Sequence, residues 1–248
     1  HVASLMTDKL FKDDSVDRER KSIIRRAALL HDVGHGPFSH VSESILNKYY
    51  SHETEKEKIH ERITGYLIRE NDQIKKIIGA DEIEKTIGLL TGSKVDFSVI
   101  RTIISGPIDA DKLDYLLRDS YFCGVKYGVF DLHRMLNTLT THVEKYDRQI
   151  ALEQGGIHSL EQFVLAKYYM TMQVYRHKIR TITDAMIIRA VELGIEHDEI
   201  PVLKKLYCYE ESDEYFDNYI NFWDEKLIYD ILNPKWFSDF KGIYYIMT

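Results

Sequence analysis

The chain has 248 residues, of which 44% are hydrophobic and 29% are charged. A chain of this length buries a core without disulfides or structural zinc. Its two cysteines, Cys123 and Cys208, lie far apart and outside any CxxC pattern, which argues against a disulfide framework or a zinc knuckle. No run approaches the roughly 20 apolar residues that cross a bilayer, and no basic leader precedes an apolar stretch. We therefore expect a soluble, cytoplasmic protein. The net charge of −7 argues against general nucleic-acid binding.

The spacing of apolar residues predicts a mostly helical chain. Residues 1–6 have the pattern of the middle of a helix, and both ends of the sequence are expected to be incomplete. An amphipathic helix over residues 17–30 is expected to end where two glycines and a proline follow, at 34–37. Further helices are expected at 39–49, from 60 onward, at 81–90, at 97–104 and at 111–119, the last with Asp109 as its N-cap.

Two features of the second half depart from a simple run of helices. Short alternating runs over Thr141–Leu152, with a turn at 146–148, predict a β-hairpin. The longest helical pattern runs from Ser159 to about Leu193. Because about 35 residues exceed an ordinary globular helix, we expect a kink or break within it. Gly194 is expected to end this pattern.

The predicted fold class is therefore all-α, a helical bundle with a small β-hairpin near 141–152. We predict one domain over residues 1–193 and a helical, acidic and aromatic C-terminal extension over 194–248. The aromatic residues of this extension are expected to belong either to an interface or, more commonly, to the core. They include Trp223, Trp236 and Phe237.

Histidines are concentrated in one short segment. Five of the eleven fall within thirty residues: His31, His35, His40, His52 and His60. Metal or phosphate chemistry is the natural explanation. His31 and Asp32 are adjacent at the end of an apolar helix, where the backbone breaks and side chains can converge. His40 and Glu43 are three residues apart on the next helix, and a histidine bonded to a carboxylate is a common general acid or base.

A second group of polar residues lies between Asp109 and Asp119. On a helix, Asp111, Tyr115 and Asp119 share one face, and Lys112 lies beside it. Such a face offers a carboxylate for a metal, a cation for phosphate and polar groups for a sugar. The alternative is an exposed charged helix with an ion pair between Asp114 and Arg118.

Together, two segments closely resemble the HD superfamily of metal-dependent phosphohydrolases, and within it the deoxynucleoside triphosphate triphosphohydrolases. They are Leu30-His31-Asp32-Val33-Gly34-His35-Gly36-Pro37-Phe38-Ser39-His40 and Asp109-Ala110-Asp111-Lys112-Leu113-Asp114-Tyr115. The resemblance covers roughly residues 1–193. It implies an HD-domain helical bundle and a metal ion held by His31, Asp32 and Asp111.

The resemblance also implies roles for the neighbouring residues. His40, Glu43 and His60 would be catalytic, with His40 and Glu43 as the proton-transfer pair. His35 and His60 would contact phosphate. Lys112 would bind phosphate, Tyr115 and Asp119 would face the sugar, and Tyr175 would stack near the deoxyribose.

The same family implies a further histidine ligand in an Arg-x-x-His-Ser-x-Gly-like segment, which this sequence lacks. Either His1 is that ligand or the ligand precedes the first residue, about two helical turns earlier. By ligand type, a set of His and Asp suits Mg, Mn, Fe, Co, Ni or Zn. A polyphosphate substrate favours Mg or Mn.

The expected activity is therefore metal-dependent hydrolysis of a nucleotide phosphate ester, with a deoxynucleoside triphosphate giving deoxynucleoside and triphosphate. A homo-oligomer is expected from the same resemblance. Lys167 and Thr171 stand where the triphosphohydrolases commonly have arginine and histidine. This difference leaves open an HD-type nucleotidase or other phosphomonoesterase. Together with the missing first ligand, it also leaves open a nucleotide-sensing protein with weak or lost catalysis.

Overall fold

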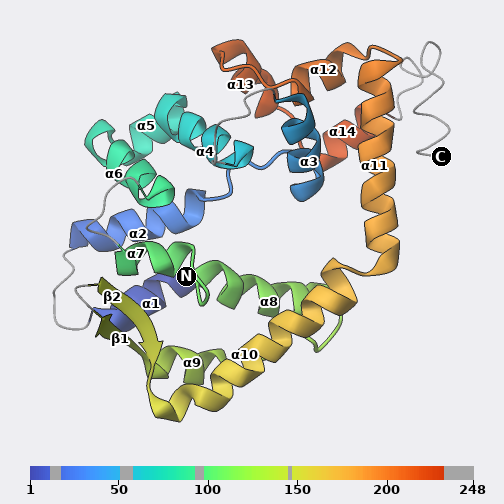
Figure 1. Cartoon of the computed structure of the whole chain (residues 1–248). Coiled ribbons are helices and arrows are strands. Elements are labelled where there is room, and N and C mark those ends of the chain that lie inside the picture. The colour runs from blue at the N-terminus through green and yellow to red at the C-terminus, as the bar shows by residue number, and fades with distance from the viewer. Residues whose placement is uncertain (12–17, 51–57, 93–97, 145–146, 232–248) are drawn as a thin grey trace. The chain divides into compact units, whose positions relative to one another are not determined.

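The computed structural model describes residues 1–11, 18–50, 58–92, 98–144 and 147–231. Within these ranges the chain is helical apart from one antiparallel pair of strands and the connecting loops (Figure 1). The predicted all-α fold with a small hairpin is confirmed. None of the described helices is both long and apolar enough to span a membrane.

The chain packs as two compact units, which we call unit 1 and unit 2. Unit 1 comprises residues 1–31 and 68–177, and unit 2 comprises residues 32–67 and 178 onward. Helix α4 (Ile59–Glu70) begins in unit 2 and ends in unit 1. The domain boundary at residue 193 stays a prediction, since it concerned the extent of the family resemblance. Trp236 and Phe237 lie outside the described residues.

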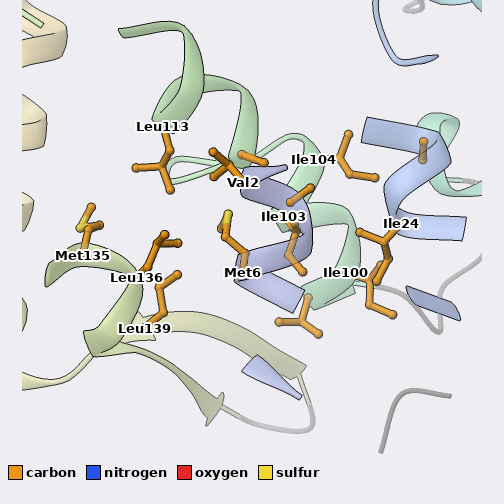
Figure 2. Packing of buried hydrophobic residues seen from close by; sticks show 14 of the residues in the cluster. Val2, Met6, Ile24, Ile100, Ile103, Ile104, Leu113, Met135, Leu136 and Leu139 are labelled. Carbon is orange, nitrogen blue, oxygen red and sulfur yellow. The ribbon is translucent and has the colours of Figure 1, made fainter. Parts of the chain in front are cut away.

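Unit 1 is built around helix α1 (Val2–Leu10), whose residues Val2, Ala3 and Met6 are buried. Their spacing places one apolar stripe along the helix. Figure 2 shows Met6 with Ile103 on one side and Leu139 on the other. The remaining elements of unit 1 are α2 (Arg18–Leu30), α5 (Asp72–Ile78), α6 (Ala80–Thr91), α7 (Ser98–Ile104), α8 (Ala110–Phe122), α9 (Leu132–Thr138), β1 (Leu139–Glu144), β2 (Asp147–Leu152) and α10 (Ile157–Met170).

The hairpin of unit 1 begins two residues earlier than expected. Strands β1 and β2 pair in antiparallel fashion from Leu139 opposite Leu152 to Glu144 opposite Asp147. Leu139 is 1% exposed and joins the core of unit 1, so burial of this side chain extends the first strand toward α9. Part of the predicted turn, residues 145–146, lies outside the described residues.

Unit 2 has a separate core formed by α3, α4 and four helices from the last part of the chain. Its fully buried residues include Ile45, Ile63, Leu203 and Tyr207. The elements are α3 (His40–Tyr49), α11 (Lys178–Glu196), α12 (Pro201–Tyr207), α13 (Asp213–Tyr219) and α14 (Asp224–Ile231). Many residues of the predicted C-terminal extension therefore belong to the hydrophobic core of unit 2.

The expected break in the long helical pattern is present. The prediction that Gly194 ends this pattern was wrong. α10 ends at Met170, a π-helical turn covers Thr171–Tyr175, and α11 begins at Lys178. Gly194 does not stop the helix; it is buried within α11. A glycine inside a helix costs about 1 kcal/mol relative to alanine. Packing of the neighbouring Val191 and Ile195 in the core of unit 2 offsets this cost.

We expect Leu113→Ala to lower the free energy of unfolding of unit 1 by about 2–5 kcal/mol, because it opens a cavity where the side chain is fully buried. Leu29→Ala is the matched control, since this leucine of α2 is 82% exposed. Denaturant unfolding followed by circular dichroism measures both. Equal losses for the two variants would contradict the core described above.

Candidate active site

The first part of the candidate site lies in unit 1, where His31 meets Asp111. His31 follows the last residue of α2, and its Nδ1 lies 3.0 Å from the carbonyl oxygen of Ala28. Because a carbonyl only accepts, Nδ1 is the donor in this hydrogen bond. Nε2 lies 3.7 Å from Asp111 Oδ1. The hydrogen bond from Nδ1 to the Ala28 carbonyl therefore orients the imidazole as a metal ligand requires.

Helix α8 presents Tyr115 and Asp119 on one face, and Tyr175 of the π-helical turn contacts both. Tyr115 and Tyr175 meet edge to face with ring centroids 6.0 Å apart, and the Tyr175 hydroxyl donates to Asp119 Oδ2 at 2.8 Å. Burial raises the pKa of Tyr115 to about 12, helped by the charge of Asp111. Burial and the bond to Asp119 also raise the pKa of Tyr175. Both phenols are therefore neutral hydrogen-bonding groups at physiological pH.

Lys112 is held at the start of α8. Its ammonium donates to the carbonyl of Gly106 at 2.9 Å and to the carboxylate of Asp109. Asp109 is 2% exposed and also accepts from the backbone N–H of Lys112 at 2.7 Å, as the predicted N-cap. The sequence indicated the cap but not this ion pair. The phosphate-binding role of Lys112 stays a prediction.

The second part of the candidate site lies in unit 2 and is centred on Glu43. One carboxylate oxygen accepts from His60 Nδ1 at 2.8 Å, and the other lies 3.6 Å from His40 Nδ1. His35 stacks on His60 with ring centroids 4.1 Å apart and meets His40 edge to face at 5.4 Å. The structure thus brings together the predicted residues of this unit around one carboxylate.

The charges of this group favour an ionised glutamate beside a neutral imidazole. Burial alone raises the pKa of Glu43, but the hydrogen bond and charge of His60 outweigh it, and the pKa lies below its ordinary value. Burial, then the charge of His60, lowers the pKa of His35. Only the His40 side chain is widely open to solvent, at 77% exposure. Such an arrangement can accept and return a proton through His40.

Other side chains of the two units offer ligand atoms as well. In unit 2, His35 Nε2 lies 3.8 Å from Asp32 Oδ1, and His60 adds a third ligand atom within 4.8 Å. Asp32 is the first residue of unit 2 and follows His31 directly in the chain. Among the described residues, His1 joins no group of three such side chains. Its role as the first ligand stays a prediction.

Two family models match the chain in succession. The HD domain model matches residues 1–119, and the HD associated region model matches residues 130–216. The chain belongs to the HD domain family. This membership confirms the resemblance inferred from the two sequence segments, and it extends past residue 193 into the last part of the chain.

Relatives of this HD protein include uncharacterized proteins and proteins named as triphosphohydrolases. It is 33% identical over 203 residues to an uncharacterized protein of Methanocaldococcus jannaschii, covering 81% of this chain and 39% of that protein. It is 30% identical over 184 residues to the deoxynucleoside triphosphate triphosphohydrolase SAMHD1 homolog of Dictyostelium discoideum. The match covers 70% of this chain and 34% of that protein.

The fold of this HD protein is shared with solved structures. A phosphohydrolase of Bacteroides thetaiotaomicron superposes with a TM-score of 0.72 at 27% identity, covering 92% of this chain and 56% of that chain. A hypothetical protein of Aquifex aeolicus superposes with a TM-score of 0.67 at 29% identity, covering 98% of this chain and 59% of that chain. The HD protein thus spans less than two thirds of each of these relatives.

We expect Gly34→Ala to lower the free energy of unfolding by about 1–3 kcal/mol, as overpacking of a filled site does. A Cβ at this position would overlap the backbone oxygen of His60 and the backbone nitrogen of Thr64. Gly65→Ala is the control, because nothing lies within 4 Å of its Cβ. This control should gain about 0.5–1 kcal/mol, since it lies inside a helix. Thermal and denaturant unfolding measure both, and a Gly34→Ala protein as stable as the control contradicts the close approach.

Proposed function

We propose that this chain carries the catalytic site of a metal-dependent phosphohydrolase acting on a nucleotide phosphate ester. The leading substrate is a deoxynucleoside triphosphate, with deoxynucleoside and triphosphate as products. The proposal rests on one observation: His31 Nε2 and Asp111 Oδ1 lie 3.7 Å apart in a family defined by a His-Asp metal motif. The name of the Dictyostelium discoideum relative supports the choice of substrate class.

The donor set of unit 1 fits a divalent cation. Ligand atoms that share one ion at about 2.0–2.2 Å lie about 3–3.5 Å apart, close to the separation of His31 and Asp111. By the resemblance, Asp32 is the third ligand. We favour Mg or Mn, while Fe, Co, Ni and Zn also suit His and Asp ligands. When bound, the ion polarises a phosphoryl oxygen and positions water.

Tyr115, Asp119 and Tyr175 would bind the sugar. A carboxylate accepts several hydrogen bonds, so Asp119 can hold the Tyr175 hydroxyl and also accept from a sugar hydroxyl. The two rings offer an apolar edge for the carbon atoms of a deoxyribose. The neutral Tyr115 phenol adds a donor without adding negative charge near a phosphate.

His40, Glu43 and His60 would transfer protons, with His35 and His60 contacting the phosphate chain. The exposed His40 ring is accessible to a leaving group, and the ionised Glu43 stabilises the protonated form of that ring. The hydrogen bond of Glu43 to His60 keeps the carboxylate in place while the charge on His40 changes.

A phosphomonoesterase of the same fold is the second candidate, and the state of Lys112 favours it. Its charge is already paired with Asp109, whereas a triphosphate needs cations along its whole length. A single phosphate group needs fewer cations than a triphosphate does. A homo-oligomer and a cytoplasmic location stay predictions from the resemblance and the composition.

We expect the chain, supplied with Mg or Mn, to release inorganic triphosphate from at least one common deoxynucleoside triphosphate. Separation of the products by ion-exchange chromatography identifies the reaction. Orthophosphate from deoxynucleoside monophosphates instead supports the second candidate. Nucleotide binding without any product, for every ion tested, removes the enzyme proposal and supports the nucleotide-sensing alternative.

We expect Asp111→Ala to abolish both metal retention and hydrolysis, because it removes a carboxylate that would ligate the ion. Asp114→Ala is the control on the same helix, where the carboxylate is 53% exposed and pairs with Arg118 at 2.9 Å. Elemental analysis after gel filtration measures the metal, and the product assay measures turnover. Unchanged turnover in Asp111→Ala would remove the proposed metal site.

A further inference from the structure

The turn between α2 and α3, residues 34–39, carries His35 and leads directly into His40. It contains two successive strained residues, Phe38 with φ of 60° and Ser39 with φ of 46°. Residues with a side chain rarely adopt this left-handed region. Such a conformation persists only where the surrounding structure holds it.

Two of the contacts that hold this turn come from neighbouring helices of unit 2. Thr64 of α4 accepts from the backbone N–H of Gly34 at 3.0 Å. Ser42 of α3 is fully buried and donates to the carbonyl of Pro37. These contacts fix one polar backbone group near each end of the turn.

The other two contacts come from the C-terminal helices α13 and α14. The Tyr219 hydroxyl donates to the carbonyl of Gly34 at 2.9 Å, and Asp224 Oδ1 accepts from the backbone N–H of Phe38 at 2.9 Å. Tyr219 is 3% exposed. Its hydroxyl lies so close to Gly36 that a Cβ there would be 2.7 Å away. The sequence alone predicted no role for either residue.

We propose that Tyr219 and Asp224 are positioning residues that hold the 34–39 turn, so that His35 and His40 keep their places around Glu43. The inference rests on the proposed phosphohydrolase function. Neither residue touches the substrate; each acts through the backbone of the turn. The two hydrogen bonds bracket His35 along the chain, and the second bond ends at the first of the two strained residues.

Substitutions that remove either hydrogen bond are expected to lower kcat. Loss of either bond leaves a backbone group of the turn without this partner and lets Phe38 and Ser39 relax. A displacement of about 1 Å in a catalytic group can lower turnover about a hundredfold. We therefore expect losses in kcat of roughly tenfold to a hundredfold, with little change in KM.

The first test compares Tyr219→Phe with Tyr215→Phe. Tyr215 lies on the same helix, is 5% exposed, and donates its hydroxyl to the carbonyl of Leu206 at 3.0 Å. Both variants lose one buried hydroxyl of the same kind, so their melting temperatures should fall alike. Only Tyr219→Phe should lower kcat and speed hydrogen–deuterium exchange of the amides in residues 34–40.

The second test uses Asp224, with rescue by a conservative variant. Asp224→Ala removes the acceptor for Phe38, while Asp224→Asn keeps an amide oxygen that can accept. Asp224→Ala should lower kcat and speed exchange in the turn, and Asp224→Asn should recover most of both. Glu225→Ala controls for the lost negative charge, because this residue also lies in the first turn of α14.

The two readouts separate this inference from the proposed function. If the wild-type chain hydrolyses no nucleotide, the proposed function fails, and exchange in residues 34–40 alone decides the inference. Equal exchange in Tyr219→Phe and Tyr215→Phe overturns it, whatever the activity. Faster exchange with unchanged kcat in an active enzyme overturns the positioning role as well.

Discussion

The approach of the His31 imidazole to the Asp111 carboxylate is the interaction on which the proposed metal site depends. The carbonyl of Ala28 accepts a hydrogen bond from His31 Nδ1, and this bond directs Nε2 toward Asp111. Asp109, buried and paired with Lys112, fixes the start of α8 and with it the position of Asp111. Each metal-ligand candidate is therefore held in place by contacts at the end of its own helix.

Unit 2 organises its histidines around the Glu43 carboxylate. Separate oxygens of this carboxylate face His60 and His40, which holds two imidazoles at different exposures near one negative charge. Burial keeps His35 neutral beside His60. The group thus combines one exposed ring, that of His40, with two largely buried rings, those of His35 and His60.

Helical periodicity predicted much of the fold because helices such as α1 and α8 bury one apolar stripe. The break between α10 and α11 followed from length alone, and the hairpin followed from alternation. Gly194 shows where local reasoning was wrong. Its helix-ending tendency is worth about 1 kcal/mol, which the packing of Val191 and Ile195 readily exceeds. Such packing involves residues far apart in sequence, so no local pattern reveals it.

The sequence by itself determined the family and predicted its site residues, because His31-Asp32 and Asp111 stand in short motifs whose spacing is local. Only the tertiary structure decided that Glu43 bonds His60 and that Tyr219 bonds the carbonyl of Gly34. The physical reason is that these bonds depend on which backbone and side-chain groups become neighbours when separate helices pack. Hydrogen bonds are too short-ranged and directional to be inferred from composition or periodicity.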